Sequence, residues 1–213
     1  MKTWNEIKKY FLNFKGLGII GGASSITNAI GAIFWFVMAS LLGTENYGEV
    51  SYLIAIGVIA SRISLVGATN SLLVFIPKGI NIQIPIYIIS ITSSILTSII
   101  VFVVFLNNPS VSLYIIGFVI FTLITSEALG RKSYSGYAKY IISQKLLLVG
   151  LSTSLFFIIG FEGVILGIAI SFFPYVIKII SDIRNKEIDF SILKSKKGFI
   201  INNYLLDLTN AFN

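Results

Sequence analysis

GEVSYLIAIGVIASRISLVGATNSLLVFI, residues 48–76, is an apolar stretch with Arg62 near its middle. Crossing the hydrocarbon core of a membrane takes roughly 20 helical residues, so this stretch is long enough to span it. Five further blocks have the same character, namely Leu17–Leu42, Ile84–Leu106, Leu113–Leu129, Ile141–Ile159 and Val164–Ile180. The pattern predicts an all-α integral membrane protein, with a six-helix transmembrane lobe over residues 17–180.

The positions of the cations predict the orientation of these spans. All of the 16 Lys and Arg residues except Arg62 lie in or beside the N-terminus and the second, fourth and sixth breaks between the apolar blocks. The other breaks contain only Glu45, Glu162 and neutral residues. Because Lys and Arg are retained on the inner side, we expect a multi-pass protein of the cell membrane with a cytoplasmic N-terminus.

Composition excludes several classes of protein. The chain is 55% hydrophobic and only 12% charged, whereas soluble domains have about 25% charged residues. The net charge of +7 flanks the apolar blocks, which favours contact with anionic lipids at the cytoplasmic face over binding of nucleic acid. The absence of Cys and His removes thiol nucleophiles, Cys/His metal sites and His acid–base chemistry. No phosphate-binding GxxxxGK[ST] loop occurs either, so we expect neither an enzyme nor a bound cofactor.

The two ends of the chain differ from the apolar blocks. Residues 1–16 form a basic leader in which aromatic and apolar residues recur at helical spacing, at Trp4, Ile7, Phe11 and Phe14. This favours a helix lying in the inner headgroup layer, with a disordered leader as the alternative. Residues 181–198 predict a basic cytoplasmic linker, and 199–213 predict the start of a seventh span. Because about 15 residues cannot cross a bilayer, we expect a piece of a longer protein; the alternative is a native six-span protein with an amphipathic tail.

Arg62 is the strongest candidate for a functional residue. An Arg at the centre of a transmembrane helix costs ~2.5–3.5 kcal/mol on insertion scales, so it normally faces a bundle interior or a wet cavity. Its fork of donors suits bidentate binding of a phosphate group. An internal ion pair with Glu127 is the alternative. Glu127 itself is expected at the inner mouth, solvated or paired with Arg131 and Lys132.

Small and hydroxyl residues line the first three predicted spans. On the second span a stripe suited to close helix packing comprises Gly57, Ser61, Ser64, Ala68 and Ser71. Most Ser and Thr side chains in such helices bond the carbonyl four residues earlier and have no further role. Three polar residues are candidates for a lining beside Arg62. They are Ser24 and Asn28 on the first span and Thr69 on the second.

Three stretches carry a resemblance to a known family. They are Leu41–Gly48 (LLGTENYG), Leu65–Thr69 (LVGAT) followed by Pro77-Lys78, and Gly160–Gly167 (GFEGVILG). Their order and the six-span spacing resemble the N-terminal half of the Wzx-type oligosaccharide flippases. That superfamily also contains multidrug exporters and flippases for peptidoglycan precursors.

The resemblance implies two six-helix lobes around a cavity that opens alternately to the two faces of the membrane. The implied substrate is an oligosaccharide on a polyprenyl phosphate or pyrophosphate carrier, used in cell-surface polysaccharide or glycan biosynthesis. Arg62 would hold the phosphate, with Asn28, Ser24 and Thr69 as polar lining, and a second transmembrane lobe would be the partner. The alternatives are a multidrug or cation antiporter and a non-transporting scaffold or gene fragment.

Overall fold

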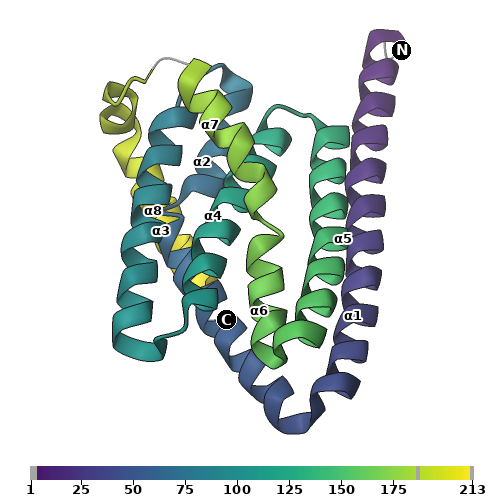
Figure 1. Ribbon diagram of the computed structural model, residues 1–213. Coiled ribbons are helices and arrows are strands. Elements are labelled where there is room, and N and C mark those ends of the chain that lie inside the picture. Colours follow the sequence, from purple (N-terminus) through teal and green to yellow (C-terminus); the bar gives the residue numbers. More distant parts are fainter. Residues whose placement is uncertain (1–3, 186–187, 212–213) are drawn as a thin grey trace.

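The computed structural model describes residues 4–185 and 188–211, with side chains for 14–104, 107–185 and 188–205. Within these ranges every regular element is helical (Figure 1). The α-helices are α1 (Trp4–Ser64), α2 (Ala68–Phe75), α3 (Gln83–Val101), α4 (Pro109–Gly130), α5 (Tyr134–Ile159), α6 (Phe161–Ile170), α7 (Val176–Asn185) and α8 (Ser191–Ala211). Short helical turns of other types are η1 (Ile76–Lys78), η2 (Phe102–Leu106) and η3 (Phe173–Tyr175). The predicted all-α class is confirmed.

α1 contains a sharp bend at Gly43, where the backbone has φ 72° and ψ 174°. This conformation is open almost exclusively to glycine, because a Cβ atom would clash with the backbone. The chain reverses direction at the bend, so α1 has a first limb before Gly43 and a second limb after it, which diverge toward the other end of the bundle (Figure 1). The predicted break between the first two apolar blocks, which follows Leu42, corresponds to this bend.

Five helical segments in the described residues are long and apolar enough to cross a membrane, namely Phe14–Ser64, Gln83–Val104, Pro109–Gly130, Tyr134–Ile159 and Phe161–Asn185. The first and second predicted spans fall in one segment because α1 is helical on both sides of Gly43. The 51 residues of this segment would make about 77 Å of straight helix, more than twice the thickness of the hydrocarbon core. The bend therefore decides how this segment fits a bilayer.

Large apolar side chains cover much of the outer surface of the bundle. Phe36, Phe157 and Ile177 are 80%, 71% and 74% exposed, and they lie on three different helices. Monomeric soluble proteins rarely expose contiguous apolar surface on this scale. The surface and the long apolar helices together support a membrane protein.

α4 occupies the centre of the bundle and contacts every other α-helix except α8 closely. Two apolar clusters form the core. One includes Met38 and Val50 on either side of the bend, together with Ile115 of α4. The second includes Leu72 of α2 and Leu123 of α4. The central position of α4 explains why its side chains are buried on most sides and why a charge on it needs internal partners.

The predicted small-residue stripe is buried along its whole length, at Gly57, Ser61, Ser64, Ala68 and Ser71. Tyr114 of α4 packs on Gly57 so closely that a Cβ atom there would lie 2.7 Å from its ring. The hydroxyls of Ser61, Ser64 and Ser71 donate to the carbonyl four residues earlier, at 2.6, 2.8 and 2.8 Å. Both the packing role and the local hydrogen bonds match the prediction.

The predicted break between the fifth and sixth apolar blocks contains a turn of a single residue. Gly160 alone separates α5 from α6, with φ 75° and ψ −151°. Beyond the turn, Gly163 and Gly167 of α6 lie against the backbone of α5, at Leu155 and Ser152. Small residues at this spacing let two helix backbones approach closely.

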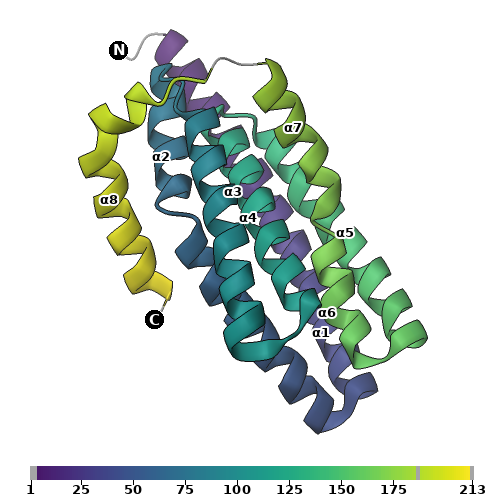
Figure 2. The same cartoon turned by 60° about the vertical axis from the view of Figure 1, so that its left-hand side comes forward.

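The described residues at both ends of the chain are mostly helical. α1 begins at Trp4 and continues into its apolar part without any non-helical residue before Gly43. Side chains before Phe14 lie outside the described set, so the leader's amphipathic face is not observed. At the other end, most of the predicted linker is helical, since α7 extends to Asn185 and α8 begins at Ser191. α8 lies at one edge of the bundle, beside α2 (Figure 2).

Candidate functional site

The second predicted span is interrupted in its middle. α1 ends at Ser64 and α2 begins at Ala68, and the turn between them contains two residues with positive φ, Val66 (50°) and Gly67 (70°). A β-branched residue such as Val66 adopts this conformation only when its surroundings enforce it. Broken helices at membrane depth are tolerated where protein or a wet cavity satisfies the freed backbone groups.

Neighbouring elements satisfy and cover this break. The carbonyl of Leu65 accepts hydrogen bonds from the backbone N–H of Ala68 (2.9 Å) and from the Ser90 hydroxyl of α3 (3.0 Å). α8 packs directly over Gly67, where a Cβ atom would lie 2.6 Å from the carbonyl oxygen of Ile200. Glycine is therefore required at position 67 for its backbone conformation and for the approach of α8.

Arg62 lies in the last turn of α1, immediately before the break, and is exposed. None of the ion pairs in the described part of the chain includes it. The alternative of an ion pair with Glu127 is wrong, because Glu127 pairs with Arg131 and Lys178 instead. The guanidinium is thus left available to a ligand or to solvent.

The other three predicted lining residues are divided between two places. Thr69 lies in the first turn of α2, half-buried, across the break from Arg62. Ser24 and Asn28 lie on the first limb of α1, half-buried and exposed respectively. That limb packs on α5, where Lys145 lies against Gly31, and it diverges from the limb that carries Arg62 (Figure 1). No hydrogen bond among the described residues joins any two of these four side chains.

A cluster of charged and polar side chains, the inter-helix polar cluster, links α3, α4 and α7. Its acids are Glu127 and Asp182, its cations are Arg131 and Lys178, and its neutral members are Gln83 and Tyr87. Glu127 is 1% exposed, yet its two oxygens accept from Arg131 Nε (2.6 Å), Lys178 Nζ (2.8 Å) and the Tyr87 hydroxyl (2.8 Å). A buried carboxylate is retained where such partners replace its hydration.

The remaining bonds close this cluster into a ring. Lys178 also donates to Asp182 (2.8 Å), Gln83 donates to Asp182 (3.0 Å), and Arg131 donates to the Gln83 side-chain oxygen (2.7 Å). Two acids and two cations balance each other. The described residues contain no group of three His, Cys, Asp or Glu residues that could hold a metal ion.

The sequence predicted only one bond of this cluster. Glu127 was expected to be solvated or paired with the nearby Arg131 and Lys132; it pairs with Arg131, but it is buried and not solvated. The ion pair between Lys178 and Asp182 could have been predicted, because the two residues are four apart and lie at the polar end of an apolar block. Gln83 and Tyr87 were not predicted, since their charged partners Asp182, Arg131 and Glu127 are far away in the chain.

The sixth predicted span is interrupted too. α6 ends at Ile170, η3 contains Pro174, and α7 begins at Val176. Gln144 of α5 donates a hydrogen bond to the Ser171 hydroxyl at this interruption (3.0 Å), and Ser171 in turn donates to Ile168 O (2.6 Å). The interruption allows α7 to take its own direction and present Lys178 to Glu127.

No family model, curated protein or solved structure matches the chain in the three comparisons with known proteins.

Proposed function

We propose that the chain is the N-terminal lobe of a flippase for lipid-linked oligosaccharides, acting in cell-surface polysaccharide or glycan biosynthesis. In this proposal the two limbs of α1 cross the membrane separately, so that there are six crossings before α8 and the N-terminus is cytoplasmic. A second lobe would close the cavity, and the two lobes would alternate access by rocking. The bend at Gly43 and the exposed apolar surface are compatible with this arrangement.

The observation that carries the proposal is the position of Arg62. An exposed Arg without an ion pair stands beside an interruption in an apolar helix. Interrupted helices near the bilayer midplane are typical of substrate sites in transporters, because their freed backbone groups and nearby charges can contact ligands. A guanidinium in such a place suits the phosphate or pyrophosphate of a polyprenyl carrier.

The polar lining in this proposal has two separate parts, because only Thr69 lies next to the break beside Arg62, while the limb that carries Asn28 and Ser24 diverges from it (Figure 1). Thr69 lies across the break from Arg62, and Asn28 and Ser24 lie on the other limb of α1. These uncharged groups would contact the sugar while Arg62 holds the carrier phosphate. An antiporter is less well supported, because Glu127, the buried acid of the bundle, already pairs with Arg131 and Lys178.

The test measures the amount of glycan exported by cells of the source organism. In these cells each variant replaces the native gene. We expect Arg62→Ala to reduce export about ten- to a hundredfold, since hydrogen bonds to charged groups contribute ~1.5–3 kcal/mol. Arg62→Lys should retain part of the activity, because it keeps the charge but loses the bidentate geometry. Membrane levels are measured by immunoblot in parallel.

Arg184→Ala is the matched control, because Arg184 is also exposed but lies at the end of α7. It should leave export unchanged. Normal export by Arg62→Ala at a normal membrane level would contradict the role of Arg62. A non-transporting scaffold predicts that result.

A further inference from the structure

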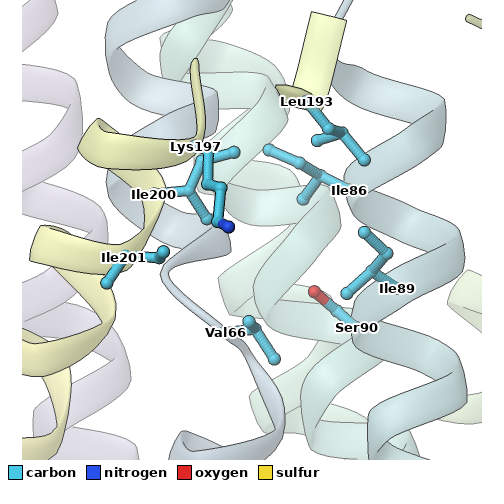
Figure 3. A pocket seen from close by; sticks show the side chains of 8 residues that line it. All are labelled: Val66, Ile86, Ile89, Ser90, Leu193, Lys197, Ile200 and Ile201. Atoms are coloured by element: carbon cyan, nitrogen blue, oxygen red, sulfur yellow. The ribbon is translucent and has the colours of Figure 1, made fainter. Parts of the chain in front are cut away.

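A pocket of about 220 Å³ opens between α8 and α3, beside the break in the second predicted span (Figure 3). Its lining is almost entirely aliphatic and comprises Val66, Ile86, Ile89, Ser90, Leu193, Lys197, Ile200 and Ile201. The hydroxyl of Ser90 already donates to Leu65 O (3.0 Å), so Lys197 is the group with hydrogen-bond donors to spare. In Figure 3 the Lys197 side chain extends from α8 toward Val66.

Three cations lie on α8 or close to it, namely Lys197, Lys196 and Lys78. Lys197 is exposed, and the ammonium groups of Lys196 and Lys78 each lie 5.9 Å from the centre of the Phe75 ring. None of these three cations takes part in an ion pair within the described residues. Asp189, which precedes α8, accepts a hydrogen bond from the backbone N–H of Ser191 (2.9 Å). The hydrogen bonds from Ser191 lower the pKa of the Asp189 carboxyl group.

We propose that this pocket binds one acyl chain of an anionic glycerophospholipid, whose phosphate group pairs with Lys197. The aliphatic walls offer a sugar or a nucleotide almost no hydrogen bonds, but they suit a hydrocarbon chain. The volume is below the ~300–1,000 Å³ of pockets for whole small ligands, so it accommodates a segment of a chain that continues into the bilayer. Lys196 and Lys78 add attraction for the negative headgroup.

This site is distinct from the proposed transport site at Arg62 and does not depend on it. The occupant would connect α3 with α8 at the break, where α8 already packs over Gly67. A lipid bound here would stabilise the docking of α8 against the rest of the bundle.

The test uses the full chain in phosphatidylcholine nanodiscs that contain a trace of phosphatidylglycerol with a diazirine in one acyl chain. After irradiation, mass spectrometry locates the labelled residues. We expect labelling at Val66, Ile89 and Ile201, displaced by unlabelled phosphatidylglycerol but not by inorganic phosphate. Lys197→Gln should reduce labelling about fivefold, because one cation at a membrane surface contributes ~1 kcal/mol.

Two variants make the result specific. Lys194→Gln removes an exposed charge from the same helix but outside the pocket lining, so labelling should not change. Ile89→Trp fills the pocket and should abolish labelling there although Lys197 remains; size-exclusion chromatography and circular dichroism verify its fold. Unchanged labelling of Lys197→Gln, or equal labelling by a phosphatidylcholine probe, would overturn the proposal. Displacement by inorganic phosphate, or by polyprenyl phosphate at a lower mole fraction than phosphatidylglycerol, would overturn the assignment to a glycerophospholipid.

Discussion

Two charged residues within apolar helices, Glu127 and Arg62, show opposite solutions to the cost of a charge in a nonpolar environment. Glu127 is 1% exposed and has its charge compensated by Arg131 and Lys178. Arg62 is exposed and has no ion pair among the described residues. A compensated charge mainly positions the helices that it joins, whereas an uncompensated one remains able to bind an anion. This difference separates a structural residue from a candidate binding residue.

We expect Glu127→Leu to destabilise the bundle by about 1–3 kcal/mol. The loss should be smaller than the ~3–5 kcal/mol for breaking a fully buried pair, because the partners keep other contacts. Lys178 still bonds Asp182, and Arg131 is half exposed and still bonds Gln83. The measurement is thermal unfolding in detergent, followed by circular dichroism.

The matched control for this prediction is Glu162→Leu, which removes an exposed acid from the first turn of α6. Its effect should be within about 0.5 kcal/mol, as for most surface substitutions. Equal unfolding temperatures for the two variants would show that the inter-helix polar cluster contributes little to stability.

At the scale of elements, interruptions decide how the helices pack. The second predicted span is divided by Leu65–Gly67 and the sixth by η3, and in each case a polar side chain from a neighbouring helix bonds a group at the interruption. Ser90 serves the first interruption and Gln144 the second. Because the freed backbone groups have internal partners, both interruptions can persist inside an apolar bundle.

Gly67→Ala should destabilise the protein more than Gly79→Ala does. Both glycines have nearly the same positive φ, 70° and 73°, so both substitutions carry a similar backbone cost of about 1–2 kcal/mol. Only the Cβ atom at position 67 meets another helix, α8 at Ile200, while position 79 has open space. The difference between the variants therefore measures the packing of α8 on the break.

Trypsin provides the readout for this comparison. Lys196 lies inside α8, so cleavage after it requires local unfolding of that helix. We expect faster cleavage after Lys196 in Gly67→Ala than in Gly79→Ala under the same conditions, because only the first variant disturbs the packing of α8. Identical cleavage rates would contradict the docking of α8 on Gly67.

At the scale of the whole molecule, the distribution of side chains is compatible with a protein that is surrounded by lipid. Apolar residues such as Phe36 and Phe157 face outward, while polar groups such as Glu127 and the hydroxyls of Ser61 and Ser64 lie inside. In lipid there is no hydrophobic driving force between helices, so small residues and internal hydrogen bonds must hold them together. Gly57, Gly163 and Gly167 supply the close approaches.

Single cysteines can test the six proposed crossings, since the native chain contains no Cys. With a cytoplasmic N-terminus, Cys at the exposed positions 45 and 162 should react with a membrane-impermeant maleimide on intact cells. Cys at the exposed positions 81 and 132 should react only after permeabilisation. External reaction at 81 or 132, or protection of 45, would contradict the proposed topology.

Much of the fold was predictable because it depends on local composition. Apolar blocks of membrane length, the break after Ile159 and the small-residue stripe on the second span all correspond to observed features. The interruptions at Leu65–Gly67 and at η3 were not predicted. Their stability depends on Ser90, Gln144 and α8, which lie far away along the chain and become neighbours only in the bundle.

The candidate sites likewise comprise features that the sequence predicted and features that depend on tertiary packing. Sequence alone identified Arg62, because a charge in an apolar block is conspicuous without any coordinates. It also predicted the helical class, since the apolar blocks have the length of membrane-spanning helices. Only the tertiary structure decided that Glu127 pairs with Lys178 rather than Arg62, and that Lys197 joins an aliphatic pocket. Those outcomes depend on which helix faces meet, and that is a property of packing between distant segments.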